Sequence, residues 1–393
     1  MVQSKQAKNE LCAFHTEEHL LLFNGENEKE RNNKIQYISI QQNWEESKMK
    51  GLKALFIGGT GTISTACSRL ALEQGWELTC MNRGNRKEEL PESVEWLQVD
   101  CSDAEAMKRA VEDRYFDVVA EFIGFTPLEV ERDIGIFSGK CNQYIFISSA
   151  SVYQTPPAHF MITESTPRKN PYWLYARNKI ACEDVLNKAY RETGFPVTIV
   201  RPSHTYCERA IPMAVEGKRG SWQILERMRQ EKPVIVHGDG TSLWTFTFNT
   251  DFAKGFCGLM GNPHALGETV HITSDETLTW NQAYEIVGQA LGVKPHLVHI
   301  PTDYISAWDS ELMGGLMGDK AHSVVFDNSK IKRLVPGFCA DVRYDQGVRR
   351  CLAYMEEHPE CRREDPEYDE WCDKLIAAYF SGLSARNVGS PKE

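Results

Sequence analysis

The chain has 393 residues, of which 41% are hydrophobic and 25% are charged, a composition typical of a globular protein of about two to three domains. Its formal net charge of -11 argues against a general nucleic-acid binder and against attachment to anionic membranes, because both need a basic surface. No segment approaches the roughly 18 apolar residues of a transmembrane helix, and the N-terminus lacks the pattern of a secretory signal. We therefore expect a cytoplasmic protein without nucleic-acid or membrane partners.

The cysteines argue for the same compartment. Twelve of them are scattered along the chain without any C-x-x-C pair. Zinc sites draw their ligands from closely spaced pairs, so the sequence predicts no metal site. In a cytoplasmic chain such cysteines are expected to be buried, reduced thiols rather than a disulfide framework.

Composition divides the chain into four stretches. Residues 1–48 are rich in polar side chains and predict a flexible extension, and Met49, just before the first predicted strand, suggests a start of translation. A dinucleotide-binding Rossmann core is expected over 49–202. A mixed stretch over 203–380 is expected to form mainly a substrate-binding part, with segments that return to the core, and 381–393 to form a flexible tail.

Apolar and amphipathic runs alternate along the first half of the chain. Strands are predicted at 54–57, 77–81, 96–99, 117–123, 144–147 and 197–200, and helices at 63–74, 103–113 and 173–192. Strands that alternate with helices of this length indicate an α/β fold with a doubly wound parallel sheet. The second half is less regular, with a strand predicted at 234–237 and helices at 280–291, 342–357 and 368–380.

A glycine-rich turn follows the first predicted strand and opens the first helix. It reads Gly58-Gly-Thr-Gly-Thr-Ile-Ser64, a G-x-x-G-x-x-S variant of the dinucleotide-binding turn. Glycine lets the backbone approach a pyrophosphate at the helix N-terminus, and serine is small enough to replace the last glycine. The cofactor-binding residues expected here are Gly58, Thr60, Gly61, Thr62 and Ile63. A purely structural turn is the alternative.

The second predicted strand ends without the acidic residue that usually binds the ribose of NAD. Asn82 and Arg83 stand there instead, with Arg86 close by, so NAD(P) is expected with a mild preference for NADP. The alternative is that both arginines are solvated surface residues. Asp100 and Cys101 follow the third strand and are expected beside the adenine.

A tyrosine and a lysine are four residues apart on the helix predicted at 173–192. This spacing places Tyr175 and Lys179 on one face of the helix, where an ammonium group is expected to lower the pKa of the phenol. A tyrosine with a lowered pKa can serve as a general acid or base. Ser149, at the end of a preceding strand, can hold the substrate oxygen beside it.

In this series of motifs, the chain resembles the extended short-chain dehydrogenase/reductases, the NAD-dependent epimerase/dehydratase group. The resemblance covers about residues 53–301. Besides the residues above it includes IFISSASVY at 145–153, Arg-Pro at 201–202, GDGT at 238–241 and Asp-Phe-Ala at 251–253. It implies that Ser149 donates to the substrate oxygen, that Tyr175 is the acid/base, and that Lys179 contacts the ribose and activates the tyrosine. It also implies a possible homodimer that pairs through the helix bearing Tyr175.

Three departures from this family narrow the expected activity. Dehydratases of the family carry an acidic pair where this chain has Ala150 and Ser151, so a 4,6-dehydratase is not expected. Trp244 stands where nucleotide-sugar epimerases place an arginine on the diphosphate, and Phe248 replaces a histidine, so the pocket is expected to be aromatic. His204 and Trp244 are expected to touch the substrate, with a hydrogen-bonded loop histidine as the alternative for His204.

These observations predict an NAD(P)-dependent oxidoreductase or epimerase that acts on a hydroxyl or ketone of a sugar-like or other small substrate. The alternative is a catalytically weak nucleotide-binding protein that is regulatory or associated with RNA. The chloroplast stem-loop binding proteins, which are related to the family, resemble this chain in the Asn-Arg-Gly turn after the second strand.

Overall fold

The computed structural model describes residues 51–386. The predicted extension over 1–48 and the start suggested at Met49 lie outside these residues. From Leu52 onward the described residues belong to one compact unit.

A seven-stranded sheet is the centre of the first part of the chain, and its strand order is β12-β7-β5-β4-β1-β2-β3. Its strands are β1 (Lys53–Ile57), β2 (Glu77–Asn82), β3 (Glu95–Gln98), β4 (Phe116–Glu121), β5 (Cys141–Ile147), β7 (Val197–Pro202) and β12 (Thr269–Ile272). Every neighbouring pair is parallel, so the predicted doubly wound parallel sheet is confirmed. The edge strand β12 was not predicted; it enters the sheet from the second half of the chain.

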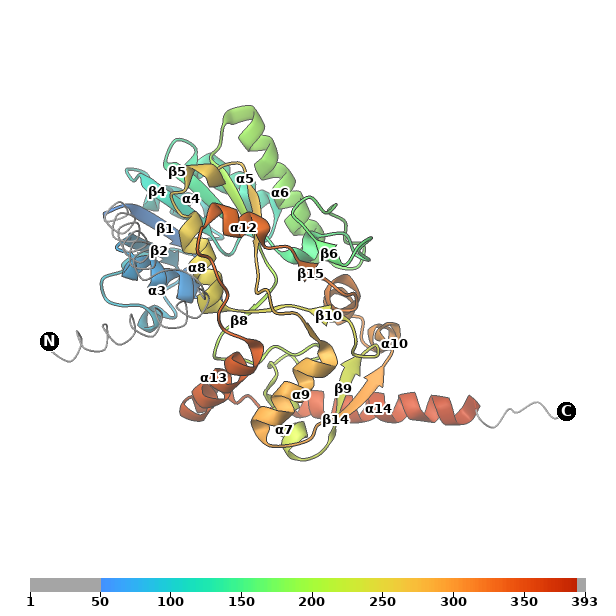
Figure 1. Cartoon of the computed structure of the whole chain (residues 1–393). Helices are drawn as coiled ribbons and strands as arrows, with labels where there is room; N and C mark the ends of the chain where they lie inside the picture. The colour runs from blue at the N-terminus through green and yellow to red at the C-terminus, as the bar shows by residue number, and fades with distance from the viewer. Residues whose placement is uncertain (1–50, 387–393) are drawn as a thin grey trace, which may run out of the picture. The chain divides into compact units, whose positions relative to one another are not determined.

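Helices cover both faces of this sheet (Figure 1). They are α3 (Ser64–Glu73), α4 (Ala104–Ala110), α5 (Pro127–Phe137), α6 (Leu174–Thr193), α8 (Asn249–Leu259) and α12 (Ser329–Leu334). Leu55 and Ile57 of β1 join the core formed with α4, α5 and α6. Phe56 packs against Phe256 of α8, with ring centroids 5.7 Å apart. A strand buried on both faces is apolar at every position, which explains the continuous apolar run at 54–57.

The second part has its own hydrophobic core, formed by residues between Tyr206 and Leu375. Its helices are α7 (Trp222–Arg229), α9 (Trp280–Leu291), α10 (Thr302–Trp308), α13 (Tyr344–Glu357) and α14 (Pro366–Arg386). Its small sheets pair β8 (His204–Tyr206) with β11 (Phe246–Phe248), β9 (Pro233–His237) with β14 (His296–Ile300), and β10 (Leu243–Trp244) with β13 (Leu278–Thr279). Figure 1 shows α7, α9 and α14 around β9 and β14. Because α14 ends at Arg386, residues 381–386 of the predicted tail are helical.

The chain passes between the two parts more than once. After β11 in the second part it returns to the first as α8 and β12, and it returns again as β15 (Val325–Phe326) and α12. β15 pairs with β6 (Met161–Ile162) of the first part. Asp251 of α8 accepts a hydrogen bond from the Val342 backbone N–H at 2.8 Å, just before α13. How far 49–202 and 203–380 behave as separate domains stays a prediction.

A buried carboxylate fixes α6 against the sheet. Glu183 is fully buried and accepts hydrogen bonds from the Ser148 hydroxyl at 2.6 Å and from Arg201 Nε and Nη2 at 2.8 and 2.6 Å. Arg168 adds a contact at 3.1 Å. Ser148 follows β5 and Arg201 lies in β7, so one side chain ties two strand ends to the helix.

This arrangement predicts very different costs for two adjacent carboxylates. Glu183→Ala should destabilise the protein by about 3–5 kcal/mol, because Arg201 would be left buried and unpaired. Asp184→Ala is the matched control: its side chain is 60% exposed and pairs with Arg168 at the surface, so about 0–1 kcal/mol is expected. Urea unfolding of the two variants measures both values, and equal losses would contradict the assignment.

Candidate active site

The glycine-rich turn is held in shape by Ser64. The Ser64 hydroxyl donates to the Gly58 carbonyl at 2.6 Å and accepts from the Gly61 N–H at 2.7 Å. Gly58 has φ +84°, and a Cβ there would lie 2.6 Å from Ile123 Cγ2. Thr62 and Ile63 lead into α3, and the Thr62 carbonyl accepts from Asn249 Nδ2 at 3.2 Å. The turn therefore presents backbone groups at a helix N-terminus, as a pyrophosphate requires.

The predicted ribose and adenine residues lie next to this turn, because β1, β2 and β3 end side by side. Asn82 Oδ1 accepts from the Gly84 N–H at 2.8 Å, whereas its buried Nδ2 has no hydrogen-bond partner among residues 51–386. A ribose oxygen fits this open donor. Arg83 is exposed, and Arg86 is paired with Glu89 at 3.3 Å. These residues fit a dinucleotide with its adenosine at the end of β2.

Asp100 and Cys101 differ in which of their groups can contact a cofactor. Asp100 accepts hydrogen bonds from the Ser102 backbone and hydroxyl at 3.0 and 2.8 Å, and these, with the charge of Arg83, lower its pKa. The Cys101 side chain is buried, and burial raises the pKa of its thiol to about 12. The thiol therefore packs inside the strand edge, which leaves only the Cys101 backbone to face an adenine.

Lys179 is held between two strand ends. Its ammonium donates to the carbonyls of Gly124 and Ile147, each at 2.7 Å, and the side chain is 1% exposed. Burial lowers the pKa of Lys179 to about 8. An ammonium group has three N–H donors, so one remains for a ribose hydroxyl.

The side chains of Ser149 and Tyr175 lie close to each other. A hydrogen bond with Ser149 lowers the pKa of Tyr175, but burial raises it by more, and the charge of Asp319 raises it further. Ser149 Oγ also lies 2.9 Å from Ser151 Oγ. The expectation that Lys179 lowers the pKa of Tyr175 is wrong for this structure, since the net shift is upward. Lys179 Nζ lies 5.8 Å from the centre of the phenol ring and is occupied by two carbonyls.

His204 and Trp244 occupy different surroundings. His204 is half-buried beside Phe246, at 5.7 Å between ring centroids, and burial lowers its pKa to about 3, which keeps the imidazole neutral. Trp244 stacks on Trp280 and is 3% exposed, and it lines a pocket beside the turn that follows Ser149. Phe248 packs in the core against Tyr206 and does not line this pocket, so its substitution for histidine changes packing instead.

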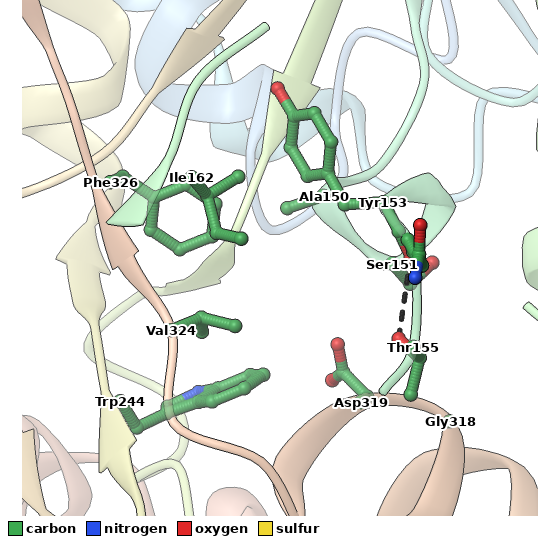
Figure 2. Close-up of a pocket in the computed structure, with 11 residues that line it drawn as sticks. Ala150, Ser151, Tyr153, Thr155, Ile162, Trp244, Gly318, Asp319, Val324 and Phe326 are labelled. Carbon is green, nitrogen blue, oxygen red and sulfur yellow. Dashed lines mark hydrogen bonds between the residues drawn. The ribbon is translucent and has the colours of Figure 1, made fainter. Parts of the chain in front are cut away.

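The pocket next to Ser149 contains a carboxylate that the sequence did not reveal. Figure 2 shows Asp319 on the side of Ser151 and Thr155, facing Trp244. Asp319 belongs to a single π-helical turn, η4 (Leu316–Lys320). No motif marked this position, and its place depends on contacts far along the chain. The remaining lining residues are Ala150, Tyr153, Gln154, Ile162, Gly318, Val324 and Phe326.

The presence of Asp319 in the pocket weakens the case against a dehydratase. That argument rested on the lack of carboxylates at Ala150 and Ser151. Both residues line the pocket, and Asp319 brings a carboxylate to it from another segment. The substitutions at 150 and 151 therefore do not by themselves exclude elimination of water.

Other predicted features can be checked only for part of the chain. Among residues 51–386 no three His, Cys, Asp or Glu side chains are grouped to hold a metal ion. The eleven cysteines in that range are all free, and nine of them are buried. Within the same residues no helix combines the length and apolar character needed to cross a membrane.

Comparison with known proteins identifies the family. The model of the "NAD dependent epimerase/dehydratase family" matches residues 54–273, and the chain belongs to this family. The resemblance inferred from the sequence is confirmed, and with it a nicotinamide dinucleotide as cofactor. The preference for NADP stays a prediction, and because the family includes dehydratases, membership does not separate the reactions.

Individual relatives are distant. The chain is 24% identical over 287 residues to a 2'-dehydrokanamycin reductase of Streptomyces kanamyceticus, a match that covers 73% of this chain and 80% of that protein. It is 24% identical over 262 residues to the chloroplast stem-loop binding protein of 41 kDa b of Arabidopsis thaliana, covering 63% of this chain and 65% of that protein. A UDP-glucuronic acid 4-epimerase from Bacillus cereus, solved with UDP-glucuronic acid and NAD, has the same fold: TM-score 0.62, 17% identity, 78% of this chain and 99% of that chain.

The glycine turn yields a testable prediction. Gly58→Ala should weaken cofactor binding at least tenfold and lower the melting temperature, because alanine is strained at φ +84° and its Cβ would clash with Ile123. Gly135→Ala is the matched control: no heavy atom lies within 4 Å of its ideal Cβ, and the residue sits in α5, where alanine is preferred. NADPH fluorescence titration and thermal melting measure both. Normal cofactor affinity in Gly58→Ala would rule out a close approach of the cofactor pyrophosphate to the backbone of this turn.

Proposed function

We propose that the protein catalyses reversible oxidation and reduction between a secondary hydroxyl and a ketone of a small, sugar-like substrate. The observation that carries this proposal is that the hydroxyls of Ser149 and Tyr175 lie close enough to interact, beside a buried Lys179. All three lie where β4, β5 and the start of α6 meet. Ligands of doubly wound sheets bind at this carboxyl edge.

The roles of the residues follow from their contacts. The nicotinamide, when bound, accepts or supplies the hydride. During reduction the Ser149 hydroxyl donates a hydrogen bond to the substrate carbonyl oxygen, and Tyr175 gives that oxygen its phenolic proton. During oxidation the phenolate takes the proton back. Lys179 keeps a positive charge near the phenolate and has one N–H left for the ribose.

Among the reactions of the family, simple reduction or oxidation is best supported. The reductase from Streptomyces kanamyceticus acts, by its name, on a ketone and matches most of this chain. An epimerase would use the same groups for both half-reactions before releasing its product.

The acid/base role of Tyr175 can be tested directly. Tyr175→Phe should bind the cofactor normally and lose about 100- to 10,000-fold in turnover, the usual contribution of a positioned acid or base. Tyr190→Phe, on the same helix but 40% exposed, is the control and should keep full activity. The assay follows NAD(P)H absorbance over a panel of sugars and keto-sugars. Full activity in Tyr175→Phe on any substrate of the native protein would refute the mechanism.

The preference for NADP rests on Arg83. Its side chain is exposed at the end of β2 and close enough to Asp100 to lower the pKa of that carboxyl, whereas Arg86 is paired with Glu89. We infer that Arg83 binds the 2'-phosphate of NADP and that Asn82 can hydrogen-bond the adenosine ribose of either NAD or NADP.

Calorimetry with both cofactors tests this inference. NADP should bind about ten- to a hundredfold more tightly than NAD, the size of a charge-assisted hydrogen bond. Arg83→Ala should remove most of this difference, and Arg86→Ala, the comparison variant, should change it less. Tighter binding of NAD by the unaltered protein would reverse the assignment.

The second candidate function is RNA association, which the stem-loop binding relative favours. The net charge of -11 counts against it, because phosphate contacts need a basic surface. A filter-binding assay with structured RNA at moderate salt separates the two functions. Retention of RNA that weakens steeply with salt would support RNA binding. If no RNA is retained, the catalytic function is the one that remains supported.

A further inference from the structure

The position of Asp319 beside the catalytic groups is imposed by a buried amide. Asn170 is 3% exposed, and its Nδ2 donates to the Ser151 carbonyl at 2.9 Å and to the Gly318 carbonyl at 2.6 Å. One side chain therefore joins the turn after Ser149 to the turn that carries Asp319. The close packing favours glycine, since a Cβ at Gly318 would lie 3.0 Å from both Asn170 Oδ1 and Trp173 Cβ.

The resulting geometry places the Asp319 carboxyl beside the reaction centre, where burial raises its pKa and the Lys320 ammonium opposes that shift. Asp319 lines the pocket with Ser151 and Trp244, and its charge is felt by Tyr175. π-Helical turns such as η4 occur frequently at functional sites. The Asp319 side chain keeps 19% exposure, so a bound molecule can reach the carboxylate.

A second carboxylate lies within electrostatic reach of the same segment. The Glu216 side chain is exposed, and the protein around its carboxyl raises its pKa to about 7. The Lys320 ammonium opposes this shift and also lies 3.5 Å from Asp319 Oδ2. Lys320 is therefore in direct contact with Asp319 and within electrostatic range of Glu216.

Trp244 adds an observation that points to a bound molecule. Its indole Nε1–H is buried and has no acceptor among residues 51–386, although the ring lines the pocket. The face of an indole favours a cation. The arginine that would attract a diphosphate is absent at this position.

We propose that the pocket selects substrates that carry a protonated amine near the reacting carbinol, such as amino sugars or aminocyclitols, and that Asp319 is the specificity-determining residue. The proposal rests on the proposed function, because it places the reacting carbinol at Ser149 and Tyr175. Asp319 accepts a charge-assisted hydrogen bond from the ammonium group of the substrate, and the charge of Glu216 adds a weaker attraction.

Binding measurements on the full chain loaded with NADP test the proposal without requiring turnover. The probes are neamine and D-glucosamine, each compared with its N-acetylated form, which keeps the hydroxyls and removes the charge. Calorimetry should give at least tenfold tighter binding of the amines, the size of one charge-assisted hydrogen bond. UDP-glucose should bind more weakly than neamine.

Variants assign the effect to the pocket. Asp319→Asn should weaken amine binding at least fivefold and leave the N-acetylated forms unchanged, with an unaltered melting temperature. Glu216→Gln, at an exposed side chain, should give a smaller loss of about threefold. Asp113→Asn removes the same charge from an exposed position far along the chain and should change nothing.

The outcomes separate this inference from the proposed function. Equal binding of amines and N-acetylated forms, or an equal loss of both in Asp319→Asn, would overturn the inference even if the enzyme oxidises sugars. Selective, Asp319-dependent binding without turnover of any amine would support the inference and count against the proposed reaction.

Discussion

The buried carboxylate of Glu183 is the interaction on which the geometry of the site depends. It draws two arginines and a serine hydroxyl onto α6 and so fixes the helix against the ends of β5 and β7. Lys179 lies one turn earlier on the same helix and reaches two carbonyls at the edge of the sheet. A helix held in this way can present Tyr175 to Ser149 with little freedom, which is what proton transfer at a defined atom requires.

Electrostatics at the site are arranged by burial more than by ion pairing. Burial lowers the pKa of Lys179 and raises that of Tyr175, so in this environment both groups are displaced toward their neutral forms. A substrate oxygen that acquires negative charge would lie beside the hydroxyls of Ser149 and Tyr175, with the Lys179 ammonium close by. Such donors stabilise charge more strongly than they would in water.

Strands and helices with a regular hydrophobic pattern could be predicted from the sequence. The strands of the sheet up to β7 and the helix at 280–291 were predicted because burial imposes a period or an apolar run. Helix α5 was missed, although Thr126 and Glu129 form a capping box at its start and Pro127 occupies its first position. Asp319 could not be predicted, because its position depends on Asn170 and on a glycine that permits close packing. The pKa of Tyr175 was predicted in the wrong direction, since spacing along a helix does not report desolvation.

The repeated passage of the chain between its two parts has a consequence for how such a protein can diversify. Strand β12 and helix α8 belong to the nucleotide-binding half but are encoded within the other half, and Asp251 joins them to the segment before α13. No single cut in the gene separates one half from the other, so neither can be exchanged whole by recombination. Substitutions in short turns such as η4 can instead change substrate preference without altering the nucleotide-binding framework.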